Sequence, residues 1–221
     1  MRASLLTILL LMSVGCEDDN GPTTPSAPSL SFFVTSATSV TGNLGGLAGA
    51  DATCLRLATA AGERQHIWRA YLSVERDPAN NNRPTHARDR IGTGPWYNAG
   101  LQLIANSVAE LHSRTGDAAL FVDERGQRIN GQWTGSPSPN QHDILTGSNA
   151  DGTVLPGMTC GDWTSDSASV RGQVGHSDGM GPNQSTAGTL ASWNSAHATS
   201  QSCANTAPGG GAGRFYCFAA R

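Results

Sequence analysis

The clearest helical pattern in this chain lies between Ala50 and Ala61. Apolar residues recur there at the spacing of a single helix face, at Cys54, Leu57, Ala58 and Ala61. Gly62 follows at once, and glycine is common directly after the last residue of a helix. The pattern therefore predicts a helix over residues 50–61 that directs Cys54 into the core.

Strands are predicted where apolar residues alternate with polar ones or form short runs. Residues 66–74 place Trp68, Ala70, Leu72 and Val74 on one side, which is the pattern of a half-buried strand. The apolar runs at 30–35 and 214–219 predict a first and a last strand, and residues 190–193 predict another short one.

The segment from Asp143 to Trp163 combines a short apolar strand with two turns. Residues 149–152 and the pair Pro156-Gly157 are typical turn formers. Cys160 then precedes Trp163 by three positions, which indicates a buried and cross-linked corner. Together with the helix and the strands, this segment predicts one α+β domain that is rich in loops.

The first 29 residues are expected to lie outside that domain. Arg2 and an apolar run at 5–12 have the form of a secretory signal, and the run is too short to span a bilayer. Small residues precede Cys16, as in the bacterial lipoprotein signal, although Ser13 stands where leucine is usual. We expect a signal peptide over 1–15, lipid modification of Cys16, a polar tether over 16–29 and the domain over 30–221. Ordinary secretion with Cys16 unmodified is the alternative.

The charge of the chain argues against a nucleic-acid partner. All fourteen basic residues are arginine, and the formal net charge is −3 at pH 7. Residues 31–221 contain 13 arginines and 14 acidic residues, without the basic stripe that is typical of nucleic-acid binding. The expected partners are therefore a surface protein or a glycan, and a membrane reached through the lipid on Cys16.

Four cysteines remain when Cys16 is set aside. They are Cys54, Cys160, Cys203 and Cys217. An even number in an exported chain predicts two disulfides, and four cysteines allow about three connectivities. No Cys-x-x-Cys pair or adjacent histidine indicates a zinc cluster among them.

Several short motifs, in this order, resemble the endostatin-like domain of certain collagens, and still more its relatives in bacterial surface lipoproteins. They are GADATC at 49–54, WRAYLS at 68–73, TGSNADG at 146–152, Cys160 with Trp163, Gly172-Gln173, Cys203 and FYC at 215–217. The resemblance covers about residues 31–221. It implies a C-type-lectin-like domain with two helices around twisted antiparallel sheets. It also implies the pairs Cys54–Cys217 and Cys160–Cys203, each contributing on the order of 2–5 kcal/mol.

One motif has the residues of a nucleophile elbow but lacks the surrounding elements that such an elbow needs. Residues 175–179 read Gly-His-Ser-Asp-Gly, which fits the Gly-x-Ser-x-Gly elbow around Ser177. The elbow needs a helix and then a later acidic residue, and Asp178 is the last acidic residue in the chain. We therefore interpret residues 176–188 as a polar loop and expect no catalytic residues.

Candidate metal ligands are weak. Lectin-type calcium sites commonly use Glu-Pro-Asn and Trp-Asn-Asp tripeptides, and here the carboxylate is missing from both, in Gly181-Pro182-Asn183 and Trp193-Asn194-Ser195. We therefore assign Trp193 to the core. Asn149 and Asp151 are weak candidates for a cation, and a turn explains them equally well. The six histidines are scattered, and the amino-terminal zinc cluster of endostatin has no counterpart. We expect neither a metal nor a cofactor.

The expected function is a non-catalytic, lipid-anchored binding module in the bacterial cell envelope, at the outer membrane or the cell surface. Its working surface is expected in the loops at 76–97, 132–141 and 176–188. The alternative is a structural or scaffolding lipoprotein of the envelope. Calcium-dependent carbohydrate binding and hydrolysis rank behind both.

Overall fold

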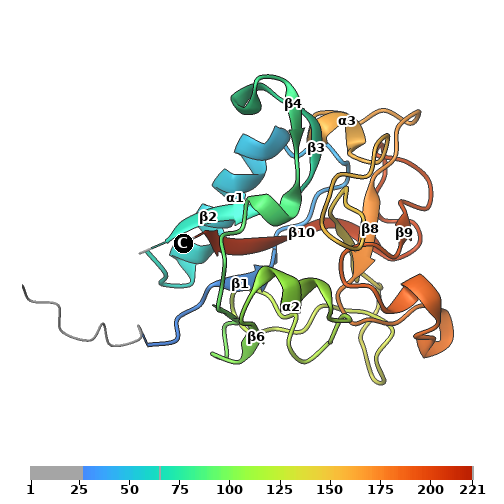
Figure 1. Ribbon diagram of the computed structural model, residues 1–221. Helices are drawn as coiled ribbons and strands as arrows, with labels where there is room; N and C mark the ends of the chain where they lie inside the picture. Colours follow the sequence, from blue (N-terminus) through green and yellow to red (C-terminus); the bar gives the residue numbers. More distant parts are fainter. Residues whose placement is uncertain (1–26, 65, 221) are drawn as a thin grey trace, which may run out of the picture.

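The computed structural model describes residues 27–64 and 66–220, and the expected signal peptide and Cys16 lie outside these residues. Figure 1 shows the helices and strands in their arrangement. The strands are β1 (Phe32–Val34), β2 (Ile67–Ala70), β3 (Val74–Asp77), β4 (Arg83–Thr85), β5 (Trp96–Tyr97), β6 (Leu103–Ala105), β7 (Asp143–Leu145), β8 (Gln173–His176), β9 (His197–Ala198) and β10 (Gly211–Ala220). The helices are α1 (Gly46–Ala60), α2 (Val108–His112) and α3 (Cys160–Trp163).

The last strand, β10, is the centre of the main sheet. Its C-terminal half lies between β1 and β2, so that Phe218 pairs with Phe32 on one side and with Arg69 on the other. Its N-terminal half pairs with β7, and β8 and β9 continue the sheet beyond β7. The β10–β7 pair is parallel, so this sheet is mixed, whereas the resemblance implies antiparallel sheets.

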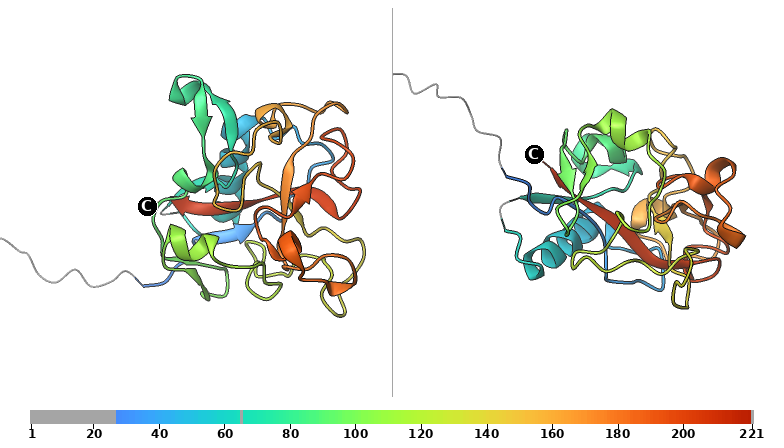
Figure 2. Two further views of the ribbon diagram at one scale, coloured as in Figure 1. Left: turned by 45° about the vertical axis from the view of Figure 1, so that its right-hand side comes forward. Right: turned by 90° about the horizontal axis from the view of Figure 1, so that it is seen from below.

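Both faces of the main sheet are buried. Phe215, Cys217 and Ala219 of β10 belong to a core on the side of α1. The alternate residues Tyr216 and Phe218 belong to a second core, on the side of α2. Figures 1 and 2 show α1 and α2 on opposite sides of β10. A strand buried on both faces needs apolar residues at successive positions, which explains the RFYCFA run in the sequence.

The predicted helix is present and is longer at its N-terminal end. It begins at Gly46 instead of residue 50 and ends at Ala60. Cys54, Leu57 and Ala58 are buried, whereas Ala61 is exposed. Gly62 has a φ of 95°, the left-handed conformation expected just after a helix.

The predicted strand over 66–74 is interrupted. It forms β2 and β3, with residues 71–73 between them. The Tyr71 amide still bonds to β10 at Tyr216, but the Ser73 amide bonds to Thr146. The chain therefore leaves the main sheet at this point, and Tyr71 and Ser73 are both fully buried. The expected alternation between a buried and an exposed face holds only for β2.

Two other strand predictions have different outcomes. Residues 188–191 form a 3₁₀ turn instead of the strand predicted over 190–193. Trp193 is nevertheless fully buried, as expected for a core residue. The last strand is present and extends from Gly211 to Ala220, beyond both ends of the predicted residues 214–219.

Two disulfides join distant parts of this α+β fold. Cys54–Cys217 links α1 to β10, and Cys160–Cys203 links α3 to the segment that precedes β10. These are the two pairs that the resemblance implies. Over residues 27–64 and 66–220, no helix has both the length and the apolar character needed to cross a membrane.

Candidate functional site

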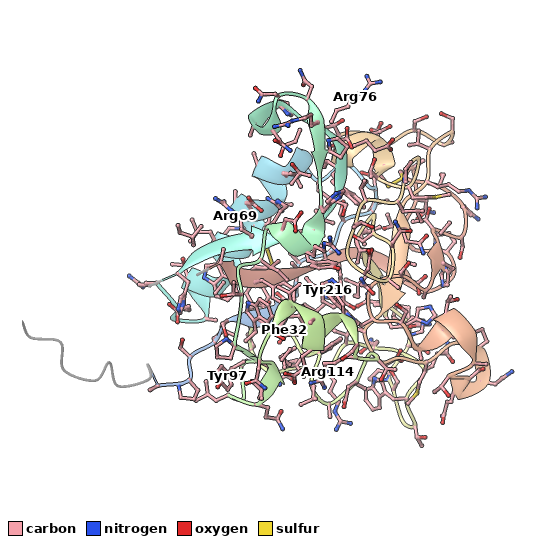
Figure 3. The ribbon with its side chains drawn as sticks, in the orientation of Figure 1. Phe32, Arg69, Arg76, Tyr97, Arg114 and Tyr216 are labelled. Atoms are coloured by element: carbon pink, nitrogen blue, oxygen red, sulfur yellow. A yellow bond between two sulfur atoms is a disulfide. The ribbon has the colours of Figure 1, made fainter. Side chains whose placement is uncertain are left out.

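A cleft of about 770 Å³ opens beside the N-terminus of α1. Five parts of the chain line it: the first turn of α1, β2, the end of β3 with the 3₁₀ turn that follows, Arg90, and α3. Leu47, Val74 and Pro78 contribute apolar surface. Arg69 and Arg76 also line the cleft, and Figure 3 shows them near α1 and near the β3–β4 hairpin. The cleft thus combines apolar walls with exposed cationic groups.

An ion cluster centred on Asp51 fixes one side of this cleft. Its carboxylate accepts hydrogen bonds from Arg69 at 3.0 Å, from Arg90 at 2.8 Å and from the Ala70 amide at 2.9 Å. The Arg90 side chain is only 9% exposed. Burial lowers the pKa of Arg90, and the nearby Asp51 charge opposes that shift. The negative charge of Asp51 is therefore neutralised within the protein.

The opposite side of the cleft is the short helical turn α3, which has strained backbone. All four of its residues have positive φ, between 51° at Cys160 and 64° at Trp163. Left-handed backbone costs roughly 1–2 kcal/mol per residue for L-amino acids other than glycine. The Cys160–Cys203 disulfide and a 2.8 Å bond from the Trp163 indole to Ser73 hold this turn in place. Backbone strain of this kind is frequent at functional sites.

The Asp162 carboxylate of α3 is also occupied by hydrogen bonds within the protein. It accepts them from the backbone amides of Glu75 at 2.7 Å and Arg76 at 3.2 Å. Asp77, the third carboxylate that lines the cleft, accepts from the Ala79 amide and the Thr85 hydroxyl. Because all three carboxylates have internal partners, the exposed guanidinium groups are the charged groups that the cleft offers to a ligand.

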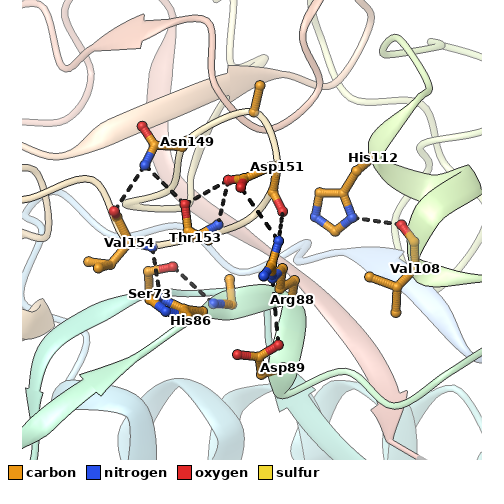
Figure 4. Close-up of polar contacts among 12 residues, drawn as sticks. Ser73, His86, Arg88, Asp89, Val108, His112, Asn149, Asp151, Thr153 and Val154 are labelled. Atoms are coloured by element: carbon orange, nitrogen blue, oxygen red, sulfur yellow. Dashed lines mark hydrogen bonds and ion pairs between the residues drawn. The ribbon is translucent and has the colours of Figure 1, made fainter.

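A second pocket, of about 620 Å³, lies between α2 and the turn that contains Asp151. Figure 4 shows Arg88 between two carboxylates, with Asp89 at 3.6 Å and Asp151 at 3.5 Å. All three side chains are well exposed. Exposed ion pairs of this kind contribute only about 0–1 kcal/mol, so a ligand could displace them at little cost.

Beneath this second pocket lies a hydrogen-bonded chain of buried groups. His112 Nδ1 donates to the Val108 carbonyl at 2.7 Å, so its Nε2 accepts from the Tyr71 hydroxyl at 2.7 Å. Asn194 donates to the same hydroxyl at 2.9 Å. Burial lowers the pKa of His112 and raises that of Tyr71, which favours the neutral form of each. These groups shape the pocket floor and carry no charge at neutral pH.

Asn149 and Asp151, the weak candidates for binding a cation, make hydrogen bonds within a turn. The Asn149 amide donates to Val154 O at 3.0 Å, and Asp151 accepts from the Thr153 amide at 3.0 Å (Figure 4). The guanidinium of Arg88 stands beside the Asp151 carboxylate, where a cation would have to bind. The turn interpretation therefore accounts for both residues.

Two of the segments expected to form the working surface differ in the structure: residues 76–97 border both pockets, whereas the segment 176–188 begins with buried residues. Residues 76–79 and 90 line the first cleft, and residues 88–93 contribute to the second pocket. Residues 176–178, expected to belong to a polar loop, are buried because β8 runs through His176 into the main sheet. Ser177 is 1% exposed, unlike the accessible serine of a nucleophile elbow.

Sequence reasoning missed one group of residues. His142, Asp143, His176 and His197 meet at one end of β7, β8 and β9. Three of the histidines interpreted as scattered are thus neighbours. Their positions are far apart in the chain and have no metal-binding spacing, so only the strand pairing reveals them. Imidazole and carboxylate are groups that can hold a metal ion.

The comparisons with known proteins identify a family without a known activity. The model of a family described as "Protein of unknown function (DUF1554)" matches residues 37–180, which is well over half of the chain. The matched segment includes α1, both pockets and the strands β2 to β8, whereas β1, β9 and β10 lie outside it. No curated protein matches the chain.

Proposed function

We propose that this chain, which belongs to the DUF1554 family, is an exported, non-catalytic module that binds a ligand at the bacterial cell surface. The cleft between α1 and α3 is the observation that carries this proposal. Its volume of about 770 Å³ lies within the range of roughly 300–1,000 Å³ that is typical of ligand pockets.

The cleft is built like a preformed recognition site. The ion cluster of Asp51 fixes one wall, and the disulfide at Cys160 fixes the other. A rigid site loses little conformational entropy on binding, which favours affinity. Residues 76–79, at the end of β3 and in the 3₁₀ turn that follows, border the same space. Side chains in such an exposed connection can be exchanged without changing the core.

The chemistry of the cleft favours a ligand with an acidic group. Arg69 and Arg76 contribute guanidinium groups, whereas the carboxylates of Asp51 and Asp162 are occupied by hydrogen bonds within the protein. Guanidinium groups bind carboxylate and sulfate groups through paired hydrogen bonds. Acidic glycans and acidic segments of surface proteins share this chemistry, and we propose that the ligand is one of these.

Reversing the charge of Arg76 tests the cleft directly. We expect Arg76→Glu to weaken ligand binding by at least about tenfold, since the loss of one charge-assisted hydrogen bond exceeds about 1.4 kcal/mol. The measurement is binding of the purified protein to an array of sulfated and uronic-acid glycans, and to envelope and host surface proteins.

Arg125→Glu is the matched control, because its side chain is 66% exposed and does not line the cleft. Binding that survives Arg76→Glu, or that falls equally in both variants, would contradict the proposed site. The scaffolding alternative would be favoured by a different pair of results. The wild type would bind no ligand, and a strain that carries Arg125→Glu or Arg76→Glu would lose envelope integrity.

Attachment to a membrane through Cys16 is a separate part of the proposal. We expect Cys16→Ser to move the protein from the membrane fraction to the soluble exported fraction, because the acyl chains supply the affinity for the bilayer. Labelling with a fatty acid followed by fractionation measures this. Ser13→Ala, which keeps Cys16, is the control. A Cys16→Ser protein that stays in the membrane fraction would argue against a lipid anchor.

A further inference from the structure

A group of four buried or half-buried polar residues lies at the end of the β7–β8–β9 sheet, away from the cleft. Asp143, the first residue of β7, pairs with His176, the last residue of β8. His197 of β9 pairs with Val174 of β8, and His142 directly precedes β7. The register of three strands therefore brings these side chains together.

The four side chains converge on one point. Asp143 Oδ1 lies 3.3 Å from His142 Nε2, 3.4 Å from His176 Nε2 and 3.7 Å from His197 Nε2. His176 Nε2 and His197 Nε2 are 2.9 Å apart. The ligand atoms of His142, Asp143 and His176 all lie within 4.8 Å of one another.

Each imidazole is oriented through its other nitrogen. His142 Nδ1 bonds to the Asp178 carboxylate at 2.8 Å. His176 Nδ1 bonds to the Leu190 carbonyl at 2.8 Å, and His197 Nδ1 bonds to the Ala198 carbonyl at 2.8 Å. A carbonyl or carboxylate oxygen only accepts, so Nδ1 carries the proton in each ring. A neutral ring then presents the lone pair of Nε2, and all three lone pairs face the Asp143 oxygen.

One oxygen of the Asp143 carboxylate is left without a hydrogen-bond partner in this group. Asp143 is 3% exposed, and within the described part of the chain its Oδ1 has no hydrogen-bond partner. A buried carboxylate oxygen without a hydrogen-bond partner is costly, and a cation held between this oxygen and the three imidazole nitrogens would offset that cost.

We propose that His142, Asp143, His176 and His197 bind one Zn²⁺ ion. Zinc takes imidazole nitrogens at about 2.0–2.1 Å and carboxylate oxygens at about 2.0–2.2 Å, usually as a tetrahedron. Ligand atoms at the corners of such a tetrahedron are about 3.3 Å apart, close to the 3.3 Å and 3.4 Å that separate Asp143 Oδ1 from His142 Nε2 and His176 Nε2. His142, Asp143 and His176 therefore form the inner part of the site, and His197, whose Nε2 is 3.7 Å from the same oxygen, is the outer ligand. Calcium and magnesium prefer sets of oxygen ligands, which this group does not supply.

The surroundings complete the site in the manner of known zinc centres. A histidine ligand commonly donates its second N–H to a carboxylate or a carbonyl, as all three do here. The Asp178 carboxylate that orients His142 is itself held in place, because it accepts hydrogen bonds from the backbone amides of Gln132 at 2.6 Å and Met180 at 3.1 Å.

The ion has a route in and a structural role. The His197 side chain is 35% exposed, whereas those of His142 and His176 are at most 3% exposed. Zinc therefore enters on the side of β9, and His197 closes the site. With four protein ligands the coordination is complete, which is the form of a structural site. The ion links three short strands that have few hydrogen bonds of their own.

Zinc binding to the exported protein tests this inference. After metal removal with a chelator and dialysis, we expect the wild-type chain to take up one Zn²⁺ ion, measured by calorimetric titration and native mass spectrometry. Zinc should also raise its melting temperature. Replacement by Co²⁺ should give the intense visible absorption of a four-coordinate ion. A wild-type chain that binds no zinc, or whose cobalt spectrum is that of the hydrated ion, would overturn the proposal.

Three variants locate the site. Asp143→Asn and His197→Gln should each weaken zinc binding by more than about 100-fold, and Asp178→Asn by about 10–100-fold. His86→Gln is the control, because His86 lies outside the group and bonds to the Val154 amide. The His197 side chain is the most exposed of the four, so His197→Gln is the variant least expected to disturb folding. It therefore stays informative if Asp143→Asn does not fold. Zinc affinity that is unchanged in His197→Gln, or that falls equally in His86→Gln, would contradict the assignment.

Discussion

Replacing Cys54 and Cys217 by alanine is expected to destabilise the protein by about 5 kcal/mol, the largest single effect that the structure implies. The bridge spans 163 residues, and the entropy that a cross-link removes from the unfolded chain grows with the length of the loop it closes. Natural domains are stable by only about 5–15 kcal/mol, so the variant should be largely unfolded or close to it.

Urea unfolding, followed by tryptophan fluorescence, measures this loss. The matched comparison is Cys160→Ala with Cys203→Ala, which opens a bridge across 43 residues and should cost about 4 kcal/mol. Both variants leave alanines in a buried core. A Cys54/Cys217 variant as stable as the wild type, or clearly more stable than the Cys160/Cys203 variant, would contradict a main role for the longer bridge.

Trp193→Ala is expected to cost about 3–5 kcal/mol, the range found for large aromatic residues removed from protein cores. Trp193 is fully buried, and its ring lies 4.8 Å from Tyr71 and 5.1 Å from Tyr216, measured between ring centroids. Its backbone carbonyl also accepts the Tyr216 hydroxyl at 2.6 Å. The side chain therefore fills the centre of the core on the α2 side of the sheet.

Thermal and urea unfolding measure this effect, with two variants for comparison. Trp193→Phe keeps a ring and removes an indole N–H that has no partner among the described residues, so it should lose much less stability. Trp133→Ala should cost no more than about 2 kcal/mol, because Trp133 is only partly buried and stacks against Arg128. Equal losses in Trp193→Ala and Trp133→Ala would argue against the central position of Trp193.

Elements with a strong local pattern were predictable. The helix around Cys54 follows from its 3.6-residue periodicity, and the last strand follows from an apolar run too short and too rich in aromatic residues for a helix. The positions of Cys160 and Trp163 in a buried corner follow from turn residues beside a cysteine. The bridge partners came from the resemblance, because four cysteines alone leave about three pairings open.

Elements that depend on distant partners were not predictable. Residues 66–74 alternate like one strand, but Ser73 bonds to Thr146 and the chain leaves β10. Residues 188–191 turn into a 3₁₀ segment that brings Trp193 to the core, against the local preference of 190–193 for a strand. In both cases tertiary packing outweighs a preference that amounts to at most about 1 kcal/mol per residue.

The candidate sites were likewise predictable only in part. The segment 76–97 was expected to carry binding residues, and Arg76 and Arg90 do line the cleft. The cleft forms because α1, β3 and α3 lie side by side, and no pattern in the sequence predicts that arrangement. His142, His176 and His197 have no diagnostic spacing, and only the pairing of β7, β8 and β9 brings them to Asp143.

By itself, the amino-acid sequence determined the class of the fold, the early helix, the last strand and the presence of two cross-links. These features depend on the periodicity and composition of neighbouring residues, so they can be predicted from the local sequence. Only the tertiary structure decided which charges line the cleft and which histidines face one buried carboxylate. Such groups are set by the register between strands far apart in the chain, and a shift of one residue would direct each side chain to the opposite face.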